Sequence, residues 1–581
     1  MEPDLWIVIS AIAVPFLTAA AIPPLHRVLG DAVGYVGVGA AALSFGLIAT
    51  QLGTQGAVVY PWIPSLEVAA RFYVDGWALL FALLASGIGV LIFGYSATYM
   101  RGKPNLGRFY AVLSAFMGSI LGVALASDLI MLFVFWELTS VCSFVLIGYH
   151  TDDADSRYSA RMAMLVTVGG GLCLLVGLLL LSVAAEAALG TRTFDLATIL
   201  ANDAAIRTAL EDSGLFVPAL ALLAVAAAAK SAQVPLHFWL PNAMVAPTPV
   251  SAFLHSATMV KVGVYAIGRV RPLFLGEEWM LVFATIGLVT MFVGAILAVA
   301  ATDSKELLAY STASHLGLMV AGFGFQSHYG AETGAFHLLN HALFKAALFL
   351  VAGIVAHEVG TRRLDAVGGL RRDLPVTAAI TVVAALSMAG VPPFNGFYSK
   401  ELLFEAAWVA ATEGGGLAWL YPVVAVAASV FTVVYSLRFL AMFFGDRRAT
   451  GVDIHRPPAA LVAPPAVLAG LAAVISIAPG RAIDLIVDDA AAAAAVEPIS
   501  IHAGIPTELS GPVAMSLLTL AIGAAMYLVV RRVRDGAEAA ITAVEPLHPS
   551  ALYRRGLAGI ETVSIRFGPA VHNGQIRTYV W

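Results

Sequence analysis

Charged side chains are scarce in this sequence. Lys, Arg, Asp and Glu make up 12% of its 581 residues, whereas hydrophobic residues make up 60%. Soluble domains average about 25% charged residues, so the composition excludes an ordinary soluble globular protein. The formal net charge of -5 comes without a basic tract long enough to attract nucleic acid. The chain is therefore predicted to be embedded in a lipid bilayer and to have no nucleic-acid partner.

Cysteine is scarcer still, and cofactor motifs are missing. Cys142 and Cys173 both lie in apolar segments, so neither a disulfide framework nor a metal cluster is indicated. The sequence contains no Walker-type phosphate loop, no dinucleotide fingerprint beside a strand and no CxxC pair. We expect no cofactor, no metal and no enzymatic activity in this chain. A redox or ATP-driven step would belong to a different polypeptide.

Long apolar segments account for most of the chain. A helix needs about 20 apolar residues to cross a bilayer. Windows of this size predict an all-α polytopic membrane protein with about fifteen transmembrane helices, whose two termini would lie on opposite sides. The windows fall at residues 4–22, 31–51, 78–100, 108–126, 128–148, 161–185, 214–233, 247–268, 279–300, 306–325, 332–357, 376–402, 418–445, 459–478 and 511–530.

The basic residues of the loops predict an orientation. Lys and Arg are more frequent in one set of alternate loops, which includes Arg101, Lys103 and the cluster at 362–372, than in the other set, which includes Arg269 and Arg271. Cytoplasmic loops are enriched in these residues. The N-terminus is therefore predicted to face outward.

Several charged residues lie inside the apolar segments. Glu137, Lys230, Lys261 and Lys345 each fall near the middle of one. An ionised side chain at the bilayer centre costs roughly 2.5–3.5 kcal/mol on insertion scales, and such residues mark ion pathways. A chain that carries several of them is predicted to move ions.

Glu137 and Lys230 are predicted to be partners. Glu137 has no basic residue within one helical turn, and Lys230 precedes Pro235, where its helix is expected to break. Backbone groups freed at such a break line a polar cavity. A lysine and a mobile carboxylate can then relay protons. The alternative is a static ion pair that locks two helices together.

Histidines and further lysines extend this series. His255 and Lys261 are six residues apart, so they face different ways on one helix, and His255 is also consistent with a buried packing residue. His337, His341 and Lys345 recur every four residues, at steps of about 6 Å along one helix face. This spacing suits proton carriers bridged by water. It also resembles a metal site, although no carboxylate or cysteine of that helix completes one; packing without transport is the other alternative.

Lys400 closes the series behind a second helix break. Two prolines and two glycines interrupt the apolar segment at 389–401, around Pro392. Breaks at matching places in two halves point to an ion path in inverted-repeat transporters. Pro235 and Pro392 each lie within about eight residues of a lysine. This correspondence suggests an internal repeat, in which spans four to eight are equivalent to spans nine to thirteen.

Other segments carry weaker predictions. The glycines at 169–171 are expected to allow close helix approach. The loop at 186–213 is expected to form a short interfacial helix, and 479–510 to form a second long outward loop. The tail at 532–581 has apolar residues at near-helical spacing among arginines. It would lie along the membrane surface or against a partner, and a mobile tail is the alternative.

These segments resemble the antiporter-like subunit family shared by Mrp-type multisubunit cation/proton antiporters, respiratory complex I and membrane-bound hydrogenases. The resemblance is carried by residues 136–140, 230–241 and 246–252 and by the stretches around His341 and Pro392, and it covers roughly residues 60–450.

The resemblance implies a fourteen-helix core of two inverted five-helix repeats, with helices 7 and 12 broken, in the plasma membrane of a prokaryote. It implies that protons enter through a half-channel at Glu137 and its partner Lys230. A central hydrophilic axis would follow, and Lys400 would end the other half-channel. The proton pathway would comprise Glu137, Lys230, His255, Lys261, His337, His341, Lys345 and Lys400. The implied segments are 1–107 for helices 1–3, 108–270 and 279–445 for the two repeats, and 446–581 for helices 14–15 and the tail.

Within the family, the chain looks more like the A-type component of Mrp Na+/H+ antiporters than like its complex I counterpart. The run 254–261 and the stretch 360–370 carry this similarity, and Lys400 resembles the lysine of the largest antiporter-like subunits, where the smaller ones usually have glutamate. The A-type component is usually longer by several helices, so either a second polypeptide continues the membrane domain or the chain is truncated. Lysine-rich axes repel bare cations. We therefore expect protons to pass through this chain and sodium to be handled by other membrane subunits.

The alternatives are a proton-pumping subunit of complex I or of a hydrogenase, and a structural scaffold whose charged axis no longer conducts. Redox centres would lie on other subunits in the first case, so this sequence would look nearly the same. The unbroken series from Glu137 to Lys400 argues against a scaffold.

Overall fold

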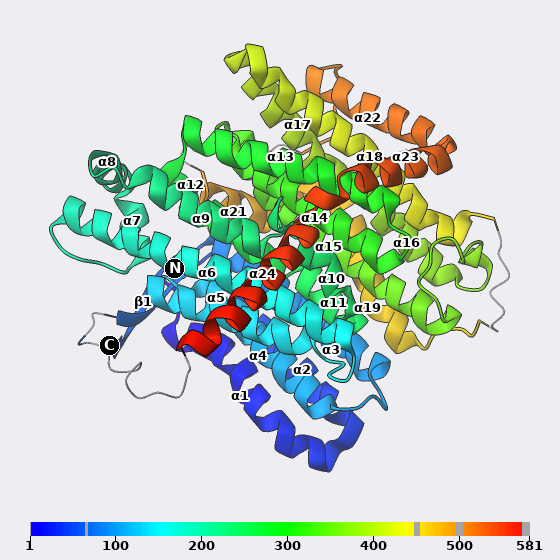
Figure 1. The fold of residues 1–581 in the computed structure, drawn as a ribbon, viewed down its shortest axis with the longest axis horizontal. Helices are drawn as coiled ribbons and strands as arrows, with labels where there is room; N and C mark the ends of the chain where they lie inside the picture. Colours follow the sequence, from blue (N-terminus) through cyan, green and yellow to red (C-terminus); the bar gives the residue numbers. More distant parts are fainter. Residues whose placement is uncertain are drawn as a thin grey trace.

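Helices form nearly all of the structure. The computed structural model describes residues 2–63, 65, 68–446, 454–495, 501 and 503–571. Figure 1 shows the helices packed against one another, with α24 running across the front of the bundle. The first half contains α1 (Leu5–Leu29), α2 (Gly34–Ala49), α3 (Gly76–Tyr99), α4 (Leu106–Leu125), α5 (Leu129–Ile147), α6 (Ala154–Leu189), α9 (Phe216–Lys230), α11 (Thr248–Ser256) and α12 (Val262–Phe274). The second half contains α13 (Glu277–Ala300), α14 (Ser304–Gly324), α15 (His328–Val359), α16 (Pro375–Ala389), α17 (Asn395–Gly414), α18 (Leu420–Phe444), α19 (Ala459–Ile477), α22 (Gly511–Leu528), α23 (Val530–Ala543) and α24 (Pro549–Val571).

The polytopic all-α prediction is confirmed, but the number of spans is not. In the described ranges, eleven helices are long and apolar enough to cross a membrane, or twelve if the bent pair 203–212 and 216–230 counts as one span. Residues 5–49 form one of the eleven, and α14 is not among them. Fifteen spans therefore remain a prediction. The structure gives fewer spans than the predicted fifteen because several helices are broken into short pieces or contain too many polar residues to count as membrane spans.

Aspartates begin several of the helices. Asp75, Asp128, Asp153 and Asp303 are the N-cap residues of α3, α5, α6 and α14, and each carboxylate accepts backbone N–H groups of the first turn. A cap satisfies donors that have no partner inside the helix. These aspartates lie at the ends of helices, where their carboxylates replace missing intrahelical hydrogen-bond partners.

A β-hairpin departs from the all-α prediction. Strands β1 (Gly56–Ile63) and β2 (Val68–Val74) pair antiparallel between α2 and α3, with Gly56 opposite Val74 and Ala57 opposite Tyr73. β-branched and aromatic residues favour strands. Strands of eight and seven residues are shorter than the apolar segments from which the helices were predicted.

Both predicted helix breaks occur. Helix α9 ends at Lys230, and the chain continues through η3 (Leu236–Phe238) and α10 (Trp239–Asn242). Helix α16 ends at Ala389, and five residues separate it from Asn395, which begins α17. Proline lacks an N–H group and ends a helix in each place.

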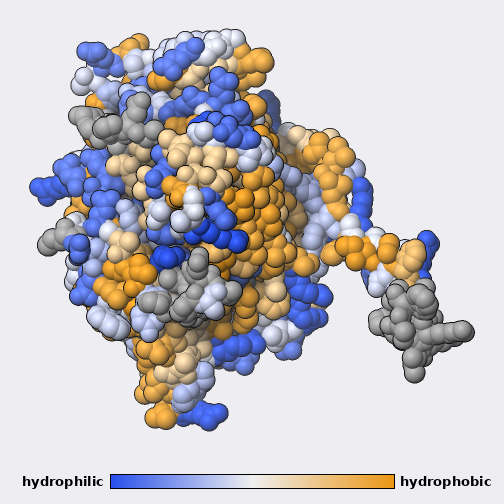
Figure 2. Space-filling view, turned by 90° about the vertical axis from the view of Figure 1, so that its left-hand side faces the viewer, coloured by the Kyte–Doolittle hydropathy of each residue, from blue (hydrophilic) through white to orange (hydrophobic). Residues whose placement is uncertain are grey.

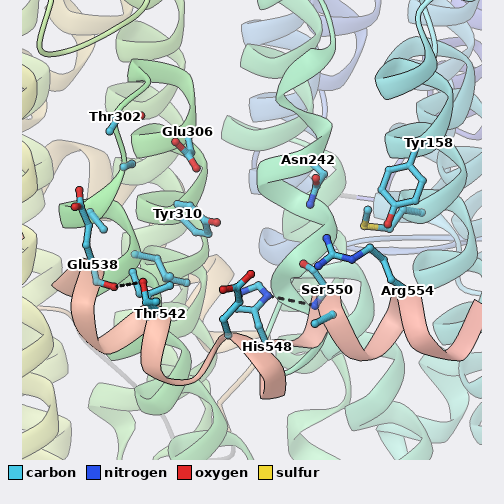
Figure 3. A pocket seen from close by; sticks show the side chains of 17 residues that line it. Tyr158, Asn242, Thr302, Glu306, Tyr310, Glu538, Thr542, His548, Ser550 and Arg554 are labelled. Atoms are coloured by element: carbon cyan, nitrogen blue, oxygen red, sulfur yellow. Dashed lines mark hydrogen bonds between the residues drawn. The ribbon is translucent and has the colours of Figure 1, made fainter.

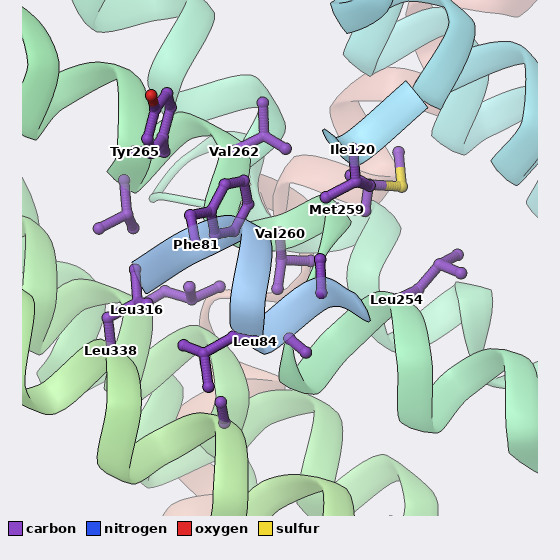
Figure 4. Packing of buried hydrophobic residues seen from close by; sticks show 14 of the residues in the cluster. Phe81, Leu84, Ile120, Leu254, Met259, Val260, Val262, Tyr265, Leu316 and Leu338 are labelled. Carbon is purple, nitrogen blue, oxygen red and sulfur yellow. The ribbon is translucent and has the colours of Figure 1, made fainter. Parts of the chain in front are cut away.

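A third break, which the sequence analysis missed, separates α11 from α12. The short 3₁₀ turn η5 (Met259–Lys261) fills it. Figure 4 shows Met259 and Val260 packed among Phe81 of α3 and Leu316 of α14. No proline marks this break, so the interruption depends on packing. It places Lys261 in an apolar interior.

The outer surface fits a bilayer. Figure 2 shows a broad hydrophobic area bounded by hydrophilic margins. The segment predicted to hold one short helix, 186–213, forms the end of α6 and two short helices, α7 (Leu196–Ala201) and α8 (Asp203–Asp212). Their place at the membrane interface stays a prediction.

The loop predicted at 479–510 instead packs inside the protein over part of its length. Its described residues form α20 (Pro479–Ala482), the π-helical turn η8 (Ile483–Val487) and α21 (Asp488–Ala492). Ala490 and Ala491 are fully buried, and the Arg271 guanidinium donates a hydrogen bond to the Ala494 carbonyl at 3.0 Å. Small side chains allow this close approach. Residues 496–500 and 502 lie outside the described residues.

Arginines 269 and 271 are also placed differently from the prediction, which assigned them to an outward loop. Both lie in α12 and are buried. Arg269 pairs with Asp75 and bonds the Tyr265 hydroxyl. Arg271 donates to the carbonyls of Phe323 and Phe325 at 3.1 and 2.9 Å. The orientation prediction assumed that arginines near span ends face water. Arg269 and Arg271 are instead buried with an acidic partner and with backbone carbonyls.

Candidate functional site

The predicted charged residues lie mostly inside the bundle. We call the following set the central axis; all but Glu137 are buried: Glu137 (α5), Lys230 (α9), His255 (α11), Lys261 (η5), His337, His341 and Lys345 (α15), and Lys400 (α17). Among the described residues, none of the four lysines forms an ion pair with a carboxylate. Burying an ammonium without a carboxylate partner is costly, so each must be stabilised by other groups or carry no charge part of the time.

Lys230 is held by α5. Its Nζ donates to the Trp136 carbonyl at 3.0 Å and to Ser140 Oγ at 2.7 Å, and lies 5.2 Å from the centre of the Trp136 ring. These groups flank Glu137 in sequence. Glu137 and Lys230 interact through their charges, as predicted. Within the described residues, however, no hydrogen bond or ion pair joins them, and the Lys230 ammonium bonds neutral oxygens of α5.

Glu137 points toward α6. Its Oε1 is buried and has no hydrogen-bond partner in the described part of the chain. A Cβ placed on Gly171 would lie 1.7 Å from this oxygen, and one on Gly170 would lie 2.4 Å from the Ala229 Cβ. The prediction of close approach at 169–171 is confirmed at these two glycines, because their missing side chains make room for the carboxylate and for α9.

This contact gives a matched pair of variants. Gly171→Ala is expected to displace the Glu137 carboxylate and to reduce proton transport by about tenfold or more, while the helix itself gains up to about 1 kcal/mol of propensity. Gly169→Ala meets nothing within 4 Å and should behave as wild type. Proton flux and assembly of both variants check this; equal flux would show that the carboxylate position does not matter.

The centre of the axis is a chain of hydrogen bonds around His337. Its Nδ1 lies 2.8 Å from Ser399 Oγ, and its Nε2 lies 2.9 Å from Nδ1 of His315. The other nitrogen of His315 lies 3.1 Å from the Tyr435 hydroxyl. Four groups from α14, α15, α17 and α18 thus form one continuous chain that can shift protons by reversing its donors and acceptors.

His315 and Tyr435 were missed by the sequence analysis. His315 is a single histidine in the 306–325 window, without the four-residue repeat that distinguished α15. His315 reaches the hydrogen-bond chain because α14 packs against α15, which brings the ring centres of His315 and His337 within 5.1 Å of each other. A buried polar residue in an apolar window was the only signal available.

His341 and His255 lack hydrogen-bond partners. Both nitrogens of each ring are buried and unpaired among the described residues. His341 lies 5.4 Å from the His315 ring and 6.2 Å from the His337 ring, and His255 lies 6.1 Å from Phe349. The packing alternative for His255 assumed a satisfied side chain. An unsatisfied buried imidazole costs free energy and is available to exchange a proton.

The remaining lysines bond to neutral oxygens. Lys261 donates to the Leu338 carbonyl at 2.9 Å, Lys345 to Ser311 Oγ at 2.5 Å and Lys400 to the Ala389 carbonyl at 2.8 Å. The last acceptor is free because α16 ends there. The second break therefore supplies the oxygen that holds Lys400.

Cavities lie at the two ends of α13. One, of 610 Å³, is lined by residues at the C-terminal end of α13, including Ala300, and the other, of 550 Å³, reaches Gly276 just before its N-terminus. A helix of 24 residues spans about 36 Å, so these cavities lie on opposite sides of the bundle.

Two glutamates near the second end were not predicted. Glu332 of α15 and Glu401 of α17 line a 410 Å³ cavity beside the 550 Å³ one. Each has a buried Oε1 without a partner in the described residues. They lie on the same helices as His337 and Lys400, and they extend the titratable series toward that side.

Known proteins resemble this chain over most of its length. Residues 126–432 match the family described as "NADH:quinone oxidoreductase/Mrp antiporter, TM", and residues 62–110 match "NADH-Ubiquinone oxidoreductase (complex I), chain 5 N-terminus". The A1 subunit of the Na(+)/H(+) antiporter of Staphylococcus haemolyticus is 39% identical over 512 residues, which cover 83% of this chain and 62% of that protein. The corresponding A1 protein of Staphylococcus aureus is 39% identical over 507 residues.

Solved structures give a similar result. A chain of the Mrp complex from Dietzia sp. DQ12-45-1b matches with a TM-score of 0.86 and 34% identity, over 99% of this chain and 61% of that one. A chain of an archaeal membrane-bound sulfane sulfur reductase shares the fold, with a TM-score of 0.72 and 23% identity, over 84% of this chain and 97% of that one. This chain spans about three-fifths of the length of the antiporter subunits it matches. The matched family covers more than half of its residues, and the chain belongs to the NADH:quinone oxidoreductase/Mrp antiporter family.

Proposed function

We propose that this chain is the proton-translocating, antiporter-like subunit of a multisubunit Na+/H+ antiporter in a prokaryotic plasma membrane, with its N-terminus outside. The observation that carries the proposal is the central axis. Four buried lysines without an ion pair and two histidines without hydrogen-bond partners, all among the described residues, form a series inside a bundle that has cavities on opposite sides.

The axis is suited to protons rather than to a bare metal cation. Its buried members are lysines and imidazoles, which bind a proton covalently and repel a cation when charged. In the described residues, no three His, Cys, Asp or Glu side chains are arranged to hold a metal ion. Sodium is accordingly assigned to other membrane subunits of the complex.

The hydrogen-bond chain supplies the transfer steps. A proton arriving at His337 can leave through His315 to Tyr435, or through Ser399, because each neighbouring pair lies within 3.1 Å. Lys261 bonds the carbonyl of Leu338, the residue after His337, and Lys345 bonds Ser311, one helical turn before His315 on α14. A charge on one lysine disfavours a charge on the next, so protons would advance one site at a time.

Sodium-driven pH change in inverted membrane vesicles tests this function. Vesicles that carry the whole complex should show a sodium-dependent proton signal, and Glu137→Gln should reduce it by at least about tenfold while the complex still assembles. Glutamine keeps the size of the side chain beside Gly171 but does not ionise. A complex that ignores sodium and pumps protons when a reductant is added would place the chain in the respiratory branch of the family instead.

A further inference from the structure

The C-terminal strap, which comprises α23, η9 (Glu545–Leu547) and α24, encloses a cavity against the bundle. The cavity has a volume of 610 Å³ and lies between the strap and residues of α6, α10, α13 and α14. Figure 3 shows Arg554, Ser550 and His548 of the strap on one side, with Tyr158, Asn242 and Glu306 of the bundle opposite. We call it the strap cavity. Its lining includes several polar and charged side chains among apolar ones, so water can occupy it beside the polar groups.

Aromatic contacts hold the strap against the first helix break. Tyr553 packs on Phe238 with ring centres 5.5 Å apart, and the His548 ring lies 6.1 Å from the His237 ring. Phe238 and His237 belong to η3, the turn that follows Pro235. The strap therefore covers the interrupted span, where backbone and side-chain polar groups face inward.

His237 is an unsatisfied group at this contact. It is 3% exposed, and neither ring nitrogen has a hydrogen-bond partner among the described residues. The mechanism proposed above does not use it. A buried imidazole next to His548, which lines the strap cavity, can accept a proton delivered through water.

His548 is placed to deliver that proton. Its Nδ1 accepts the backbone N–H of Ser550 at 3.3 Å, which leaves Nε2 as the nitrogen that exchanges with its surroundings. Partial burial and the Arg554 charge lower the pKa of His548, whereas Glu545 opposes them. The side chain is therefore neutral near pH 7 and binds a proton only transiently. Glu306 and Glu538 also line the cavity and attract protons to it.

A route inward exists from His237. Two residues later, Trp239 donates its indole N–H to the Ala229 carbonyl at 2.9 Å, next to Lys230. The Trp239 ring also lies 6.4 Å from the ring of His255. The same short segment thus contacts the strap on one side and, on the other, His255 and the residue that precedes Lys230.

We propose that His548 and His237 form a proton-exchange pair at the strap cavity, so that the C-terminal strap supplies the outermost residue of the proton path. This inference rests on the proposed function. A proton from cavity water binds His548, leaves it through a bridging water for His237, and moves on toward the axis. Each imidazole returns to its neutral form, so one proton leaves for each that arrives.

Chemical rescue tests the pair in vesicles that carry the whole complex. His548→Ala is expected to reduce sodium-driven proton flux by about tenfold, and added imidazole should restore it, because the cavity has room for the free ring. Each flux is normalised to the wild type at the same imidazole concentration. His455→Ala, at an exposed position, should match the wild type, and imidazole should not rescue Lys230→Ala.

The outcomes separate this inference from the proposed function. Unchanged flux in His548→Ala, or a loss that imidazole does not restore in an assembled complex, would overturn the exchange pair and leave only a structural role for the strap. Neither result affects the axis. A wild-type complex without sodium-driven proton flux would instead overturn the proposed function. His548→Gln, which keeps a polar side chain but no titratable nitrogen, should show the same loss as alanine if packing is unaffected.

Discussion

Lys230→Ala is expected to abolish sodium-driven proton transport, with a loss of at least about 100-fold. The ammonium is fully buried and is the group that bonds both the Trp136 carbonyl and Ser140 Oγ. Alanine removes the titratable atom at the end of α9 and leaves neutral acceptors that hold no proton. The complex should still assemble, because a buried charge without a carboxylate partner adds little to stability. Proton flux in vesicles, normalised to the amount of assembled complex, measures the effect.

Ser140→Ala is the matched control for this variant. It removes one hydrogen bond to the ammonium, worth about 1.5–3 kcal/mol when the donor is charged, but keeps the Trp136 carbonyl and the lysine itself. We expect its proton flux to fall by far less than that of Lys230→Ala. If Lys230→Ala retained near wild-type flux in an assembled complex, the relay through the end of α9 would be excluded.

Asp75→Asn is expected to lower the free energy of unfolding by about 3–5 kcal/mol. Asp75 caps α3 and pairs with Arg269 of α12, and both side chains are buried. Arg269 also bonds the Tyr265 hydroxyl at 2.6 Å. The amide leaves the guanidinium buried without a counter-charge, which costs more than the pair itself contributed. Thermal unfolding of the detergent-purified complex measures the change.

Glu211→Gln is the comparison for that variant. Glu211 pairs with Arg207 at 2.8 Å on the surface of α8, where both side chains are partly exposed. Pairs of this kind contribute about 0.2–1 kcal/mol, so the midpoint of unfolding should barely move. Similar shifts for Asp75→Asn and Glu211→Gln would show that the Asp75–Arg269 pair is not a buried anchor between α3 and α12.

Local sequence patterns were sufficient to find the axis. Lys230, Lys261, Lys345 and Lys400 stand out because each is a charge in an apolar segment, and apolar context is a property of neighbours in the chain. The two proline-marked breaks could be predicted for the same reason, since proline ends a helix wherever it stands. The repeat on α15 follows from a fixed helical period.

The contacts between helices could not be predicted in this way. Lys230 interacts with the charge of Glu137, as expected, but its hydrogen bonds go to Trp136 and Ser140 on either side of that residue. His315 carries no pattern of its own and enters the chain only because α14 packs on α15. Which atoms meet across an interface depends on helix rotation and on small residues such as Gly171, and neither can be read from one segment alone.

The sequence by itself determined the membrane class, the approximate positions of the helices and most of the titratable residues inside them, because hydropathy and helical period act over short stretches of chain. Only the tertiary structure decided which of those residues share hydrogen bonds, how Arg269 is neutralised, and that the C-terminal strap covers the first helix break. Each of these depends on side chains that are distant in sequence and adjacent in space, and packing of the whole bundle brings them together.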